Sequence, residues 1–157
     1  MIKYNRDFRM KIILCLTAFL LVISPCLAFS AHFEGVSGTP DWQDIAGSIT
    51  INGLPAETGD EVAVFCGNLL VGIFTVTSKG QFGFLHCYGE FVSGTGDGAP
   101  IGSELTIKVW QASTKKEITL TTAMMSSKAQ EGLLEIKIPL TYQGQKNKYS
   151  LNIKAIY

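Results

Sequence analysis

Two histidines, His32 and His86, are the residues of this chain best suited to act as catalytic bases. Neither has an evident serine partner, and the chain has no G-x-S-x-G nucleophile elbow. Acidic pairs such as Asp41 and Asp44 could serve a glycosidase only if two carboxyl groups faced each other at about 5–9 Å. Their spacing along the chain does not establish such a geometry. We therefore predict no catalytic residues and a protein that is not an enzyme.

Copper is the metal that the histidines could bind. A cut of the chain after Ala31 would make His32 the first residue, and an N-terminal histidine with a second histidine resembles the histidine brace of lytic polysaccharide monooxygenases. Imidazole is a good ligand for copper. However, this cut would place Phe29 at the −3 position, where a small residue is preferred. A copper protein using His32 and His86 is thus an alternative, and no cofactor is our first expectation.

Calcium is the other metal considered. Asp60, Glu90 and Asp97 lie in or beside predicted loops, and the loop of residues 94–102 is rich in glycine. Calcium prefers six to eight oxygen ligands. Only Asp97 lies within that loop, and no D-x-D-x-D spacing occurs. A solvated glycine loop is therefore predicted in place of a calcium site.

Aromatic residues near loops or strand ends could bind a sugar, because sugar rings stack on exposed aromatic faces. Trp42, Tyr88 and Trp110 have such positions. Trp110 shares a strand face with Lys108 and Thr106, which indicates that this face is at least partly exposed. These three aromatic residues are the candidate ligand platform, with core packing as the alternative role.

The N-terminus has the layout of a secretory signal peptide. Basic residues precede the apolar run of residues 12–23, and small residues follow it. The run is too short to span a bilayer. Cleavage after Ser30 places Ala28 at −3, and cleavage after Ala28 is the other acceptable site. We expect a signal peptide at 1–30, an exported domain at 31–157, and no transmembrane span in the mature chain.

The charge of residues 31–157 argues against a nucleic-acid partner. This part of the chain has nine lysines, twelve acidic residues and no arginine, for a net charge of −3. Arginine is the side chain best suited to bind phosphates and base edges. An acidic protein without arginine is therefore predicted not to bind nucleic acid.

Two cysteines, Cys66 and Cys87, remain after removal of the predicted signal peptide. An even number of cysteines in an exported chain favours a disulfide. Two cysteines allow a single pairing, so we predict a bond between Cys66 and Cys87. Two buried free thiols are the alternative.

Short alternating segments separated by turns must position these residues. Turn signals recur about every 8–12 residues, which is typical of antiparallel sandwiches. Gly67-Asn68 suits a two-residue hairpin turn, and residues 134–142 and 149–157 predict a second, longer hairpin. We expect an all-β fold with a single antiparallel β-sandwich, immunoglobulin-like or jelly-roll-like, of about eight strands.

The stretch "DWQDIAGSITINGLPAETGDEVAVFCGNLLVGIFTV", together with "GFLHCYG" and "GAPIGSELTIKVW", resembles exported bacterial β-sandwich modules of surface and secreted proteins. The resemblance covers residues 41 to about 112. It implies a sandwich fold without catalytic residues, in which Gly59 and Asp60 form a turn while Phe65 and Gly72 serve packing.

These observations together predict a non-catalytic module for binding, or for assembly at the cell surface or outside the cell. Its partner would be a protein or a glycan. A carbohydrate-binding module is the first alternative, and the N-terminal-histidine copper protein is the second. Location in the periplasm, at the cell surface or in the medium, and oligomeric state, are not determined by the sequence.

Overall fold

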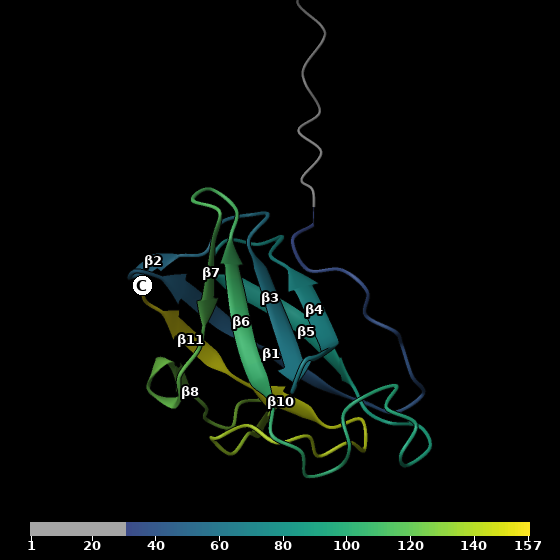
Figure 1. Ribbon diagram of the computed structural model, residues 1–157. Coiled ribbons are helices and arrows are strands. Elements are labelled where there is room, and N and C mark those ends of the chain that lie inside the picture. Colours follow the sequence, from purple (N-terminus) through teal and green to yellow (C-terminus); the bar gives the residue numbers. More distant parts are fainter. Residues whose placement is uncertain (1–30) are drawn as a thin grey trace, which may run out of the picture. The chain divides into compact units, whose positions relative to one another are not determined.

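Two β-sheets face each other in this protein (Figure 1). The structure is a computed structural model and describes residues 31–157, so the predicted signal peptide lies outside the described residues. The all-β sandwich prediction is confirmed, although the described part has eleven strands, three of them only two residues long. The strands are β1 (Trp42–Ile51), β2 (Leu54–Pro55), β3 (Glu61–Cys66), β4 (Leu69–Thr75), β5 (Gln81–Tyr88), β6 (Thr106–Gln111), β7 (Lys116–Thr119), β8 (Met125–Ser126), β9 (Leu134–Glu135), β10 (Lys148–Ser150) and β11 (Asn152–Ala155), with one 3-10 turn, η1 (Thr122–Met124).

The larger sheet is organised around β1. β5 and β10 pair with the two edges of the first half of β1, while β2 and β11 pair with its second half. β10 and β11 run parallel to β1, so the sheet is mixed, whereas a purely antiparallel sheet was expected. β8 and β9 extend the sheet beyond β11 and β10.

The predicted C-terminal hairpin is wrong. Leu134 in β9 pairs with Tyr149 in β10, and this pairing is parallel. The intervening chain binds elsewhere: Leu105 N donates to Leu140 O at 2.9 Å, and Tyr142 N donates to Ser103 O at 2.9 Å. Both segments alternate as a hairpin would, but residues 140–142 find backbone partners in the loop before β6.

The smaller sheet is antiparallel, with the order β4-β3-β6-β7. The predicted hairpin through Gly67-Asn68 is confirmed, since Cys66 pairs with Leu69 across it. Gly67 has a φ of 59°, a left-handed conformation that glycine adopts without strain. This turn fixes the register of β3 and β4 and so decides which of their residues point inward.

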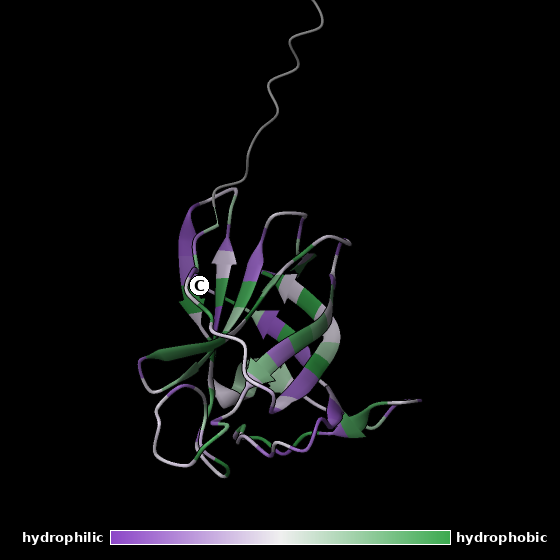
Figure 2. Cartoon of the chain, turned by 90° about the vertical axis from the view of Figure 1, so that its right-hand side faces the viewer, coloured by the Kyte–Doolittle hydropathy of each residue, from purple (hydrophilic) through white to green (hydrophobic). Residues whose placement is uncertain are grey.

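The core lies between the two sheets. Hydrophobic and hydrophilic residues alternate along the strands (Figure 2), as expected when one face of each sheet is buried. The inward residues of the central strands include Ile45, Ile49, Val62, Val64, Ile107 and Val109, each at most 1% exposed. Burying a side chain of this size stabilises the fold by about 1.5–3 kcal/mol.

The outward residues form two surfaces. The β1–β5 face, on the larger sheet, consists of Trp42, Asp44, Ser48, Gln81, Phe84, His86 and Tyr88. The β3–β6 face, on the smaller sheet, consists of Glu61, Ala63, Phe65, Lys108, Trp110 and Glu117. Residues 31–41, here called the N-terminal strap, run along the side of the sandwich and lead into β1 (Figure 1).

The described residues form one compact unit, Ala31–Tyr157. Among these residues, no helix has the length and apolar character needed to cross a membrane.

Candidate functional site

Three aromatic side chains gather at one end of the β1–β5 face. Trp42 and Tyr88 are directly paired across β1 and β5, and Asp44 and His86 form the next pair on the same face. The His86 ring centroid lies 6.0 Å from those of both Trp42 and Tyr88, with interplanar angles of 71° and 50°. The three rings line a hollow of about 250 Å³ together with Gly38 and Thr39 of the strap. We call Trp42, His86 and Tyr88 the ring cluster.

Asp44 holds His86 in place within the ring cluster. The carboxylate is only 7% exposed and is hydrogen-bonded through Oδ1 to Nδ1 of His86, whose side chain is 48% exposed. A buried carboxylate needs such a partner, because burial without one costs free energy. The bond leaves Nε2 of the imidazole as the ring nitrogen without a bond to Asp44. The register of β1 against β5 thus places Asp44 where it fixes the orientation of the exposed His86 ring.

Two lysines lie over aromatic rings of the same face. The Lys146 ammonium is 4.4 Å from the ring centroid of Trp42, and the Lys148 ammonium is 4.8 Å from that of Phe84. Cation–π contacts of this kind contribute about 0.5–1 kcal/mol at exposed sites. They place hydrogen-bond donors next to aromatic surface, which is the combination that orients a ligand in many binding sites.

The strap forms a fixed wall of the hollow. The Thr39 hydroxyl is 2.7 Å from Gly89 O, and the Tyr142 hydroxyl donates to Asp41 Oδ2 at 3.0 Å. Burial is the largest effect on Tyr142, and it raises the pKa of this phenol, with the neighbouring Asp41 adding to the shift. The neutral phenol therefore remains a donor to Asp41 across the ordinary pH range, and this bond helps to hold the strap in place.

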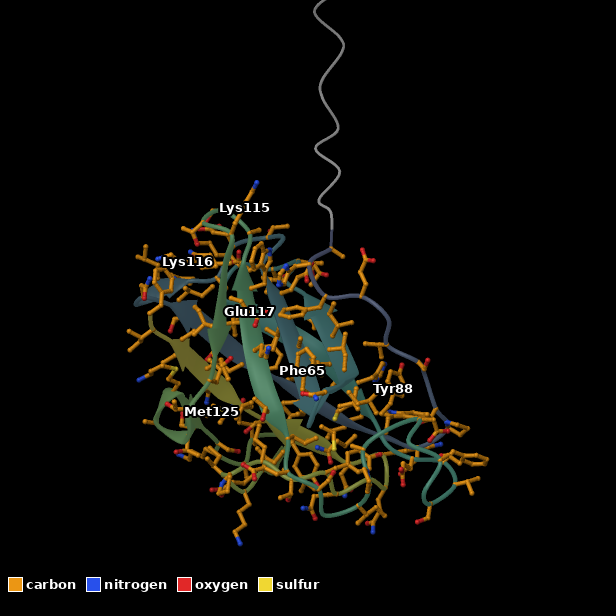
Figure 3. The ribbon with its side chains drawn as sticks, in the orientation of Figure 1. Phe65, Tyr88, Lys115, Lys116, Glu117 and Met125 are labelled. Atoms are coloured by element: carbon orange, nitrogen blue, oxygen red, sulfur yellow. The ribbon has the colours of Figure 1, made fainter. Side chains whose placement is uncertain are left out.

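Trp110, the third predicted platform residue, lies elsewhere. It is on the β3–β6 face, and its ring stacks on that of His32 with centroids 3.7 Å apart and planes 5° from parallel. In Figure 3, Phe65 and Glu117 mark this face of the smaller sheet, and Tyr88 marks β5 of the larger sheet. The structure thus brings Trp42 and Tyr88 together and separates Trp110 from both. Sequence spacing could not reveal this, because it does not say which sheet a strand joins.

The N-terminal strap explains the burial of the β3–β6 face. The backbone N–H groups of His32 and Phe33 donate to the Glu61 carboxylate at 3.0–3.1 Å, and Phe33 packs edge-on against Phe65. His32 Nε2 lies 3.1 Å from Glu117 Oε2. The pKa of Glu117 is lowered, mainly by its hydrogen bond from Lys108 and next by that of His32.

The structure does not bring together the residues considered for metals. His32 and His86 belong to the outer faces of different sheets, so the proposed copper pair is not formed. Within residues 31–157, no three or more His, Cys, Asp or Glu side chains are grouped as a metal site.

The three calcium candidates also have other partners. Asp60 accepts the N–H groups of Glu57 and Ala112, each at 2.9 Å. Glu90 accepts those of Gly94 and Gly96 at 3.0 and 2.9 Å, and Asp97 accepts the Thr95 hydroxyl at 2.6 Å. These carboxylates stabilise turns, so the expected turn role of Asp60 has a direct structural basis.

The predicted disulfide is not formed in the structure. Cys66 and Cys87 are both free thiols. Cys66, at the end of β3, is half-buried and lies 3.4 Å from the Ser103 hydroxyl, whereas Cys87, on β5, is fully buried in the core. Cys66 contributes to the raised pKa of Cys87, so the two thiols lie near each other although no bond joins them.

A second hollow lies at the other end of the β1–β5 face, and none of its lining residues was among the candidates from the sequence. Its volume is about 430 Å³, and its lining includes Ser48, Phe74, Thr77, Gln81, Gln130 and Asn152. The lining comes from β1, β4, β5, β11 and the loops after β4 and β8. Gly47 and Gly83, which also line it, are the only signal in the sequence that backbone is exposed there.

Comparison with protein-family models, with curated proteins and with solved structures gives no match for this chain. The candidate function therefore depends on the geometry of the site.

Proposed function

We propose that this protein is a non-catalytic binding module whose ligand is a carbohydrate. The observation that carries the proposal is the ring cluster: three aromatic side chains, from paired positions on adjacent strands, surround one hollow of about 250 Å³. Sugar rings pack their C–H faces on aromatic surfaces, while their hydroxyl groups need nearby polar partners. His86, which lines the hollow, and Lys146, whose ammonium lies over the Trp42 ring, supply such partners.

The packing of the site favours binding over catalysis. Asp44 is engaged by His86, and no carboxylate is among the described residues that line the hollow. A glycosidase needs two opposed carboxyl groups. A preformed hollow with fixed rings lowers the conformational cost of binding, which is what a binding module requires.

The proposal includes export. A carbohydrate-binding module acts on polymers outside the cytoplasm, in agreement with the predicted signal peptide and with the resemblance to exported β-sandwich modules. Assembly with a surface protein through the same face is the alternative.

Affinity electrophoresis through gels containing soluble polysaccharides tests the proposal. Trp42→Ala removes one wall of the hollow, and truncating a central aromatic anchor costs about 2 kcal/mol or more, which is roughly thirtyfold in affinity. Trp110→Ala is the matched control, because it removes the same side chain from the β3–β6 face. We expect retardation by the polysaccharide to be lost in Trp42→Ala and kept in Trp110→Ala.

Unfolding midpoints in urea confirm that both variants remain folded. Equal retardation of the wild type and Trp42→Ala would place the ligand away from the ring cluster and contradict the proposal. Loss of retardation in Trp110→Ala alone would assign the ligand to the opposite sheet.

A further inference from the structure

The second hollow lies on the same face of the sandwich as the ring cluster. Ser48 and Trp42 are six positions apart in β1, an even number, so both side chains point outward from the sheet. At about 3.3 Å per residue, they are about 20 Å apart. Phe84, which is 49% exposed, points outward from β5 between Gln81 at the second hollow and His86 at the ring cluster. Outward side chains therefore connect the two hollows along one line.

The chemistry of the second hollow is uncharged throughout. Every side chain in its lining is neutral, and hydroxyl and amide groups predominate: Ser48, Thr77, Ser78, Gln81, Gln130 and Asn152. Such groups can donate and accept hydrogen bonds but cannot neutralise a charge. An ionic ligand placed there would lose hydration without gaining a counter-charge. The hollow is therefore suited to a neutral ligand with many hydroxyl groups.

Local backbone features form this hollow. The register of β5 against β1 shifts between Ile45 and Gly47, and Gly83 lies at this irregularity. A Cβ atom at Gly83 would lie 3.4 Å from the ring of Phe74, so the absence of a side chain there leaves part of that ring uncovered. The ring thus supplies an apolar surface for the C–H groups of a sugar, next to the hydroxyl and amide groups.

One hydrogen bond orients two of the polar groups. The Ser48 hydroxyl donates to Asn152 Oδ1 at 2.7 Å. This leaves the Asn152 amide N–H₂ as a donor and the Ser48 oxygen as an acceptor. A donor and an acceptor held side by side match the hydroxyl pairs of a sugar ring.

We propose that the two hollows are subsites for one linear, uncharged oligosaccharide that lies along the β1–β5 face. The inference rests on the proposed function and adds to it the ligand's charge, its minimum length and a second binding region. A monosaccharide cannot span about 20 Å, so affinity should rise with chain length until both hollows are occupied, as for any ligand with two linked contacts.

Titration calorimetry and affinity electrophoresis of the purified protein test this inference. The probes are neutral polysaccharides (mixed-linkage β-glucan, galactomannan and xylan), acidic ones (alginate and polygalacturonate), and length series of oligosaccharides from the neutral polymer that binds. The variants are Gln81→Ala and Thr77→Ala in the second hollow. Thr119→Ala, an exposed strand residue of the smaller sheet, is the matched control.

We expect binding to a neutral polymer, with affinity reduced roughly three- to tenfold by Gln81→Ala or Thr77→Ala, the loss typical of one or two hydrogen bonds. Thr119→Ala should bind as the wild type does. The two second-hollow variants should weaken binding of long oligosaccharides and leave that of the shortest bound oligosaccharide, which occupies the ring cluster alone, unchanged.

Several results would overturn the inference while leaving the proposed function intact. The first is that Trp42→Ala loses binding while both second-hollow variants keep wild-type affinity. The second is that only acidic polymers bind. The third is that affinity does not depend on chain length. No binding to any polysaccharide would overturn the inference and the proposed function together.

Discussion

At the scale of single residues, the two cysteines show how burial decides chemistry. Cys87 is fully buried, and burial raises the pKa of its thiol to about 12, with Cys66 contributing a smaller effect. The thiolate is the reactive form of cysteine. We therefore expect Cys87 to be unreactive in the folded protein, and Cys66, which is half-buried at the end of β3, to be the more accessible thiol.

Alkylation of the native protein checks this difference. With iodoacetamide at pH 8, we expect modification of Cys66 alone, and modification of Cys87 only after unfolding in guanidinium chloride. Mass spectrometry of the digested protein measures both sites. If neither cysteine reacts in the unfolded protein until a reductant is added, the two are bonded, and the original sequence prediction would be restored.

At the scale of elements, the close approach of β4 to β5 joins the two sheets at one side. Gly72 of β4 faces the backbone of β5, and a Cβ atom there would lie 2.4 Å from His86 O. A side chain of any size would force the strands apart. This contact explains the packing role expected of Gly72, and it also fixes the strand that carries His86 and Tyr88.

Substitution of Gly72 by alanine tests the contact. Because the clash involves backbone that cannot move away easily, we expect Gly72→Ala to lower the free energy of unfolding by about 3 kcal/mol. Gly83→Ala is the matched control, since its Cβ would meet the Phe74 ring at an ordinary 3.4 Å and stability should change much less. Urea denaturation followed by circular dichroism measures both. Equal stability of the two variants would show that β4 and β5 are not in close contact.

At the scale of the whole molecule, the sandwich encloses ionisable groups that must stay neutral. Cys87 and Tyr142 both have raised pKa values, mainly because of burial. The unfolded chain therefore loses these protons at a lower pH than the folded protein does. Their contribution to stability is complete below the pKa of the unfolded groups and is lost as the pH rises toward that of the folded groups.

Stability should accordingly fall at alkaline pH. For Cys87 the window runs from the ordinary value of 9.0 to about 12. We expect the melting temperature to decrease steadily above pH 9, and Cys87→Ala to reduce the steepness of that decrease. Differential scanning calorimetry between pH 7 and 11 in constant salt measures it. A melting temperature that does not change over this range would mean that neither group is buried in solution.

The sequence predicted several elements because their signals are local. The hairpin of β3 and β4 follows from Gly67, which adopts a left-handed φ at no cost, and from alternation on both sides of it. By contrast, the partners of the C-terminal strands could not be predicted. Residues 140–142 alternate like a hairpin strand, but their backbone groups bond to residues 102–105. The partner of this segment depends on which distant part of the chain folds next to it, and the local sequence pattern does not contain that information.

The sequence by itself determined the all-β class, the main hairpin, and the presence of aromatic residues suited to a ligand. Only the tertiary structure decided which aromatics meet: Trp42 and Tyr88 share a face with His86, while Trp110 stacks on His32 across the molecule. The physical reason is that alternation sets which way a side chain points within its own strand. Its neighbours depend on strand pairing and on which sheet the strand joins, and these are set by contacts between residues far apart in the chain.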